Sequence, residues 1–238
     1  MVKTRFDFIL LLLLSVLYAQ YVLTSEYKCN SEDPCGCSTQ PATTDESARE
    51  NSWNWLVSLQ DKNGHFCHGS ILSEKYIITA AHCLRKTIYP LSNITICIAA
   101  NRLSDSCREY YAIDNAISHP LYNHETFEND IALIRVQTSL NFINKSIARI
   151  CLPNADLQMD TDLIAPSWNT NETSNITNDL EQMKMQIVNQ SMDTCASTAF
   201  NHQTQLCVAT LTNSRALLRS MIVCHLIRFC LSFDRFLS

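Results

Sequence analysis

Twelve cysteines spread along 238 residues are the strongest constraint on what this chain can fold into. They follow a basic start and an apolar run from Phe8 to Leu17, which is typical of an export signal. The run is too short for a membrane span, which needs about 20 apolar residues. An exported chain enters an oxidising compartment, where an even, dispersed set of cysteines forms disulfides. We therefore expect a secreted, extracellular protein with a disulfide framework.

The beginning of the chain is expected to carry no core of its own. Ala19 is small enough to precede a cleavage point, with Ser25 as a second candidate, so residues 1–19 are predicted to be a signal peptide. No membrane contact is expected after its removal. Residues 20–51 contain three cysteines and few apolar side chains, and we expect a leader or propeptide-like segment.

Metal and nucleic-acid functions are disfavoured by the same composition. Cys35 and Cys37 are separated by one residue, and the chain has neither a Cys-x-x-Cys pair nor a His-x-x-x-His pattern. We therefore expect no metal and no cofactor. A net charge of −5 does not favour a nucleic-acid surface.

Five Asn-x-Ser/Thr sequons fit an exported chain and predict glycosylated surface loops. They begin at Asn93, Asn144, Asn171, Asn175 and Asn189.

The middle of the chain has the pattern of an all-β protein. Residues 53–60 mostly alternate apolar and polar side chains, as a half-buried strand does. The Asn-Gly pair at the end of Asp61–Gly64 predicts a turn. Further short strands are expected at 66–71, 76–79, 94–99, 131–136 and 183–188, with a long exposed loop at 165–182. Short strands separated by turns indicate a sandwich or a barrel.

Two strings carry chemistry: Ile77-Ile-Thr-Ala-Ala-His-Cys83 and Asn129-Asp-Ile-Ala-Leu-Ile-Arg135. With residues 52–60 and 66–73 they resemble the chymotrypsin/trypsin family of serine peptidases. The resemblance covers about residues 52–209 and implies that His82 is the general base and Asp130 the carboxylate that orients it. His65 and His68 flank Cys67 and are expected to be ordinary surface residues of a strand.

The resemblance also implies a fold and a set of disulfides. We expect a chymotrypsin-like double β-barrel, with the first barrel at about 52–140 and a partial second barrel at about 150–209. Cys67 would pair with Cys83, and Cys151 with either Cys35 or Cys37. Cys195 and Cys207 would close a loop of the second barrel.

The chain departs from the family pattern in its glycines and its nucleophile. Only Gly36, Gly64 and Gly69 occur, and no Gly-Asp-Ser-Gly-Gly-Pro string follows Cys207. The family's Ile-Val-Gly-Gly activation motif is missing near residues 42–45. Three later serines lack the flanking glycines: Ser214, Ser220 and Ser232. We expect an incomplete second barrel, followed by a divergent apolar tail at 210–238.

These observations predict a secreted trypsin-like serine endopeptidase family protein that is inactive in this form, because its serine nucleophile is absent. The alternative is a non-catalytic protease homologue that acts as a binding or regulatory module. Its partners would be a protein or peptide substrate, a protease or an inhibitor.

Overall fold

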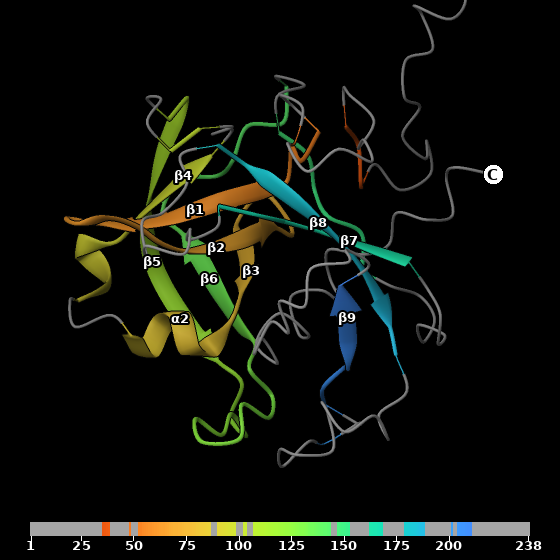
Figure 1. Ribbon diagram of the computed structural model, residues 1–238. Helices are drawn as coiled ribbons and strands as arrows, with labels where there is room; N and C mark the ends of the chain where they lie inside the picture. The colour runs from red at the N-terminus through yellow and green to blue at the C-terminus, as the bar shows by residue number, and fades with distance from the viewer. Residues whose placement is uncertain are drawn as a thin grey trace, which may run out of the picture.

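The computed structural model describes residues 35–38, 48, 52–86, 90–98, 102–103, 107–143, 147–152, 162–168, 179–188, 201 and 204–210. These residues form strands with two short helices, α2 (Ala81–Lys86) and the 3₁₀ helix η1 (Leu91–Asn93) (Figure 1). The strands are β1 (Leu56–Asp61), β2 (Gly64–Ile71), β3 (Tyr76–Thr79), β4 (Thr95–Ile98), β5 (Glu109–Ser118), β6 (Ala132–Val136), β7 (Asp162–Ser167), β8 (Glu181–Ile187) and β9 (Val208–Thr210). The expected all-β class is confirmed.

Six of these strands close into an antiparallel barrel. Their order is β1-β2-β3-β6-β5-β4, and β1 completes the ring by pairing with both β2 and β4. Closure leaves none of the six strands as a free edge. The predicted β-barrel architecture is therefore confirmed.

Local sequence explains the individual strands. In β6 the side chains of Ala132, Ile134 and Val136 are buried, whereas those of Leu133 and Arg135 face solvent. This is the period of two that strands impose. The Asn-Gly turn also forms as expected. Gly64 has a φ of 104° there, which residues with a Cβ rarely adopt, so the turn favours glycine at this position.

A second unit consists of a three-stranded sheet, in the order β7-β8-β9, within the described residues. It packs beside the barrel (Figure 1). The indole Nε1–H of Trp53 donates to Oε1 of Gln182 at 3.1 Å, and Trp168 and Leu180 join the apolar core of the barrel. The predicted loop at 165–182 is partly wrong, since its first three residues lie in β7 and its last two in β8.

None of the helices in the described part of the chain has the length and apolar character that a bilayer span requires.

Candidate active site

His82 lies where the chain leaves β3 and enters α2. The two alanines before it, Ala80 and Ala81, are fully buried, so larger side chains would not fit there without displacing their neighbours. This packing explains the small residues in the Thr-Ala-Ala-His-Cys string. It places the histidine at the end of the barrel, with its side chain 11% exposed.

Asp130 reaches His82 because of the pairing of two strands. Thr79, the last residue of β3, pairs with Ala132, the first residue of β6. The chain that leaves β3 therefore passes the chain that enters β6, and Asp130 lies two residues before Ala132. Its side chain is 2% exposed.

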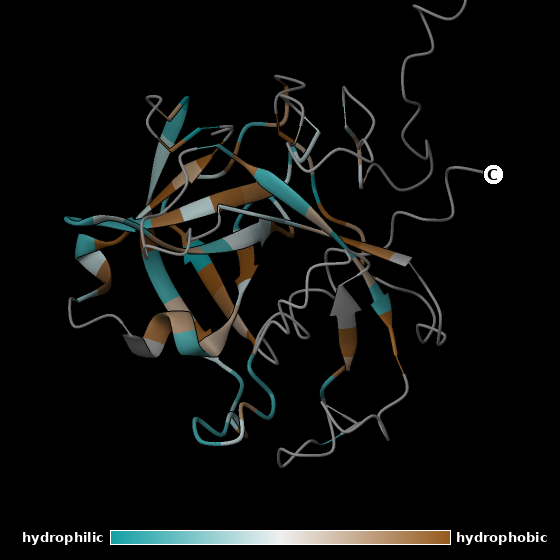
Figure 2. Ribbon diagram, in the orientation of Figure 1, coloured by the Kyte–Doolittle hydropathy of each residue, from teal (hydrophilic) through white to brown (hydrophobic). Residues whose placement is uncertain are grey.

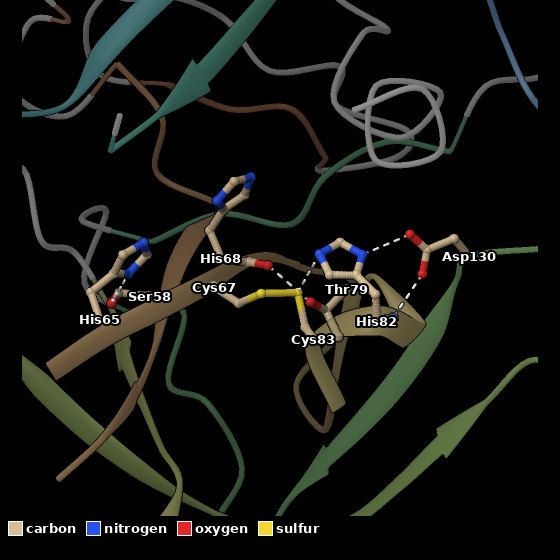
Figure 3. The surroundings of a disulfide bond; sticks show 8 residues. All are labelled: Ser58, His65, Cys67, His68, Thr79, His82, Cys83 and Asp130. Carbon is tan, nitrogen blue, oxygen red and sulfur yellow. Dashed lines mark hydrogen bonds and ion pairs between the residues drawn. A yellow bond between two sulfur atoms is a disulfide. The ribbon is translucent and has the colours of Figure 1, made fainter. Parts of the chain in front are cut away.

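Two hydrogen bonds join these residues (Figure 3). Oδ2 of Asp130 lies 2.7 Å from Nδ1 of His82, and Oδ1 accepts the backbone N–H of His82 at 2.8 Å. A carboxylate has no proton to donate, so Nδ1 must carry the hydrogen. In the neutral ring Nε2 is then unprotonated, which is the state a general base requires.

The Nε2 edge of the imidazole lies beside a disulfide. Nε2 of His82 lies 3.5 Å from Sγ of Cys83, and Cys83 is bonded to Cys67 (Figure 3). Cys67, His82 and Cys83 bring three potential ligand atoms within 4.8 Å of one another. Metal ligation needs thiolates, however, and both sulfurs are joined in the disulfide. This cluster therefore does not form a metal site while the disulfide is intact.

An aromatic ring covers the imidazole from the loop before β6. The rings of His82 and Phe127 meet edge to face, with centroids 6.3 Å apart. Phe127 has a φ of 57° and Asn129 a φ of 54°, so two residues with a Cβ adopt the left-handed conformation. The resemblance to the family identified His82 and Asp130 from their strings, but it gave no indication of this contact.

The comparisons with known proteins agree with this geometry. A family model described as trypsin matches residues 43–217. This chain belongs to the trypsin family. It is 29% identical over 163 residues to mannan-binding lectin serine protease 1 of Mus musculus, an alignment that covers 62% of this chain. The chain spans only 23% of the length of that mouse protein.

Three disulfides are described in this trypsin-family chain, and the expectation of disulfide bonds is confirmed. They join Cys35 to Cys151, Cys67 to Cys83, and Cys97 to Cys107. The structure thus places Cys35, and not Cys37, on Cys151. The last pair ties β4 to the segment just before β5, and neither the cysteine spacing nor the family resemblance predicts it.

Other predicted positions are only partly described. Cys37 and Cys207 are also disulfide-bonded, whereas Cys195 lies outside the described residues. Asn93 is exposed at the end of η1, as a glycosylated residue must be. The remaining positions lie outside the described residues: Asn144, Asn171, Asn175, Asn189, Ser214, Ser220 and Ser232.

His65 and His68 are not ordinary surface residues, contrary to expectation. The pairing of β1 with β2 skips Phe66, and this bulge turns both histidines to one face although they are three positions apart. Nδ1 of His65 lies 2.8 Å from Oγ of the buried Ser58, and its ring meets Trp168 edge to face. The two imidazole rings are parallel, with centroids 6.5 Å apart.

Burial changes the titration of both histidines. It lowers the pKa of His65 to about 4, and the neighbouring charge of His68 acts in the same direction. Burial and then the charge of His82 lower the pKa of His68 to about 4. Both rings are therefore neutral at physiological pH, which suits a contact between the barrel and the second unit.

Proposed function

We propose that this chain is a secreted member of the trypsin family that retains the histidine–aspartate pair but does not hydrolyse peptide bonds in its 238-residue form. One combination of observations supports this proposal. Asp130 holds His82 in the tautomer of a general base, yet the chain contains no glycine after Gly69. The nucleophile string of the family contains several glycines and would lie in the second half of the chain.

The pair alone can move a proton but cannot open a peptide bond by the family's mechanism. With a serine hydroxyl at Nε2, His82 would accept its proton and later return it to the leaving amine. Asp130 would fix the ring and stabilise the imidazolium. Removing the serine from such a site costs about a millionfold in turnover. Donors that bind the oxyanion contribute about 10²–10³ each, and the glycine-containing loop that supplies them is missing too.

The four later candidates for a nucleophile are poor substitutes. Ser214, Ser220 and Ser232 lack neighbouring glycines, and Cys224 lies in an apolar segment of the sequence. A thiol in apolar surroundings keeps its proton and is a poor nucleophile.

An activity assay tests the proposal directly. The purified chain would be incubated with arginine, lysine and aromatic ester substrates, with and without a serine-directed phosphonate. A His82→Ala variant is the matched control, because it removes the general base. We expect the same background rate for both proteins. Hydrolysis that the phosphonate blocks and His82→Ala abolishes would overturn the proposal.

Secretion is the second part of the proposal. The charged and apolar start, the disulfides and the exposed Asn93 support it. Expression in a secretory cell should release a protein whose first residue is Gln20, or Glu26 if the second site is used. Its mass should fall on treatment with an N-glycosidase. A protein that stays in the cell with Met1 intact would contradict this part.

A binding function is the alternative, and the intact barrel supports it. The first barrel is closed and has a continuous core, whereas the activation motif is missing. Such a chain could present the family's surface to a proteinase, an inhibitor or another protein without cleaving it. A pull-down from the matching secretory fluid should recover a specific partner. Recovery of the same proteins by an unrelated glycosylated β-protein would argue against this alternative.

A further inference from the structure

The loop between β5 and β6 connects the second unit to the His82–Asp130 pair. It runs from His119 to Ile131 and lies at the foot of the barrel, where it is mostly hydrophilic (Figure 2). Its first half is closed by its own hydrogen bonds. The side-chain oxygen of Asn123 accepts the N–H groups of Glu125 and Thr126 at 2.9 and 3.3 Å. Local sequence thus accounts for this half.

The second half of the loop holds the unusual backbone. Phe127 and Asn129 have φ angles of 57° and 54°, in the left-handed region. Asparagine tolerates this region, but a bulky residue such as phenylalanine rarely adopts it. A residue in a sparsely populated conformation persists only where the surrounding structure holds it. Bonds within the loop hold part of this half: the N–H of Asn123 donates to the carbonyl oxygen of Glu128, and Nδ2 of Asn129 donates to that of Leu121, each at 3.0 Å. The carbonyl oxygen of Thr126 and Oε1 of Glu128 are instead bonded from outside the loop.

Two residues that precede β9, and that we count with the second unit, bind the neighbours of Phe127. Nε2 of Gln205 donates to the carbonyl oxygen of Thr126 at 2.9 Å, and Nδ2 of Asn201 donates to Oε1 of Glu128 at 2.7 Å. The backbone N–H of Asn201 donates in turn to Oε1 of Gln205 at 2.9 Å. Gln205 is 3% exposed. Both ends of the side-chain amide of Gln205 are thus hydrogen-bonded: Nε2 to the barrel loop and Oε1 to Asn201 of the second unit.

We infer that Asn201 and Gln205 are positioning residues, which hold the loop so that Phe127 covers the His82 ring and Asp130 meets His82. Phe127 contacts the imidazole directly, and Asp130 follows it by three positions. The clamp, meaning Asn201 with Gln205, fixes Thr126 and Glu128 on either side of Phe127. Strand pairing brings Asp130 beside His82, and the docking of Asn201 and Gln205 then fixes the geometry of their contact, although the pair itself lies on the barrel. This inference does not rest on the proposed loss of activity.

The test compares two buried glutamines of the second unit. Gln205→Met removes the bond to Thr126 at similar side-chain volume. Gln182→Met is the matched control, because Gln182 is also buried and also bonds the barrel, but through Trp53 and away from the loop. Two N–H groups of His82 donate to Asp130, the ring Nδ1–H and the backbone amide. The readouts are the NMR resonance of the Nδ1–H and the hydrogen-exchange rate of the amide.

In Gln205→Met we expect the Nδ1–H signal to be lost and the His82 amide to exchange at least about tenfold faster. The amide of Ile134, in the middle of β6, should keep its rate, because the barrel stays closed. Gln182→Met should leave the His82 signals unchanged. Unchanged His82 signals in Gln205→Met would overturn the inference, as would equal changes in the two variants or a parallel rise at Ile134.

A milder variant protects the test against misfolding. Asn201 is only partly buried, and Asn201→Ala removes the bond to Glu128 without placing an apolar chain in the core. We expect faster exchange at His82 by several-fold. If Gln205→Met does not fold and Asn201→Ala leaves His82 unchanged, the inference is wrong.

Discussion

Asp130 uses both oxygens of its carboxylate on one residue, His82, which lies 48 positions earlier in the chain. One oxygen orients the imidazole, and the other holds the backbone N–H at the start of α2. The carboxylate therefore supports the fold and the proton-transfer group at once. This double use gives Asp130 a structural role that does not depend on catalysis.

The first prediction concerns Asp130→Asn. An amide can accept through only one of its two ends, so one N–H of His82 loses its acceptor in a buried site. Such a loss costs about 1–3 kcal/mol. Urea unfolding followed by tryptophan fluorescence should show a decrease of this size in the free energy of unfolding.

Asp114→Asn is the control for that measurement. Asp114 also has a basic partner, Arg135 at 2.6 Å, but both side chains are nearly half exposed. Exposed ion pairs contribute about 0–1 kcal/mol. Equal losses in the two variants would show that Asp130 has no special structural role.

The barrel was largely predictable because its strands carry local signals. Residues 76–79 form a short, mostly apolar run that predicts a strand, and Asn63-Gly64 marks a turn. β5 was missed, since the buried alternation of Tyr111 and Ile113 breaks at a bulge after Ile113. β7 was missed because it contains Pro166. Within a sheet proline is confined to edge strands, strand starts and bulges, and among the described residues β7 lies at the edge of its sheet.

The site was predictable only where a local string defines it. His82 and Asp130 each lie in a short motif whose packing fixes the neighbours. The Phe127 contact depends on positive φ angles that no glycine announces, and on bonds from residues more than about 70 positions later in the chain. His65 and His68 share a face only because of the bulge at Phe66. Contacts between residues far apart in the chain leave no signal in a short stretch of sequence.

The second prediction concerns Gly69→Ala. A Cβ at this position would lie 2.7 Å from the carbonyl oxygen of Ile78 and 2.9 Å from Cγ2 of Ile77. The oxygen belongs to the paired backbone of β3 and cannot move away. Overpacking of this kind costs about 1–3 kcal/mol. Thermal unfolding should show a lower midpoint.

Gly64→Ala separates crowding from backbone strain. Nothing lies within 4 Å of a Cβ at Gly64, but its φ of 104° disfavours any residue with a side chain. Asparagine tolerates positive φ better than alanine, so Gly64→Asn should be no less stable than Gly64→Ala. At position 69 the problem is space, so no residue larger than glycine should restore stability there. A fully stable Gly69→Ala would contradict the described pairing of β2 with β3.

The third prediction concerns the disulfide beside His82. Cys67 and Cys83 are 16 positions apart, and a closed loop of that length stabilises a fold by about 3 kcal/mol through the entropy of the unfolded chain. The double variant Cys67→Ala/Cys83→Ala should lose about this amount in urea unfolding without reductant. Cys97→Ala/Cys107→Ala, with a separation of 10, should lose slightly less. A loss below about 1 kcal/mol at Cys67–Cys83 would contradict the entropic explanation.

The fourth prediction concerns pH and the two histidines of β2, His65 and His68. Burial lowers the pKa of His65 and of His68 from 6.5 to about 4 in the folded state. Between these values the unfolded chain binds protons that the folded chain does not, so the free energy of unfolding falls as the pH falls from 6.5 to 4. Well above pH 6.5 both states are neutral and this loss disappears.

The slope contributed by each histidine is at most about 1.4 kcal/mol per pH unit. Urea unfolding at several pH values would compare the parent chain with His65→Gln/His68→Gln. The double variant should show a flatter dependence between pH 6.5 and 4, because glutamine cannot take up a proton. His124→Gln, in an exposed loop, controls for the removal of a histidine as such. If the double variant keeps the full slope of the parent chain, the acid sensitivity comes from other groups, and the neutral state assigned to the partly buried His65 and His68 is wrong.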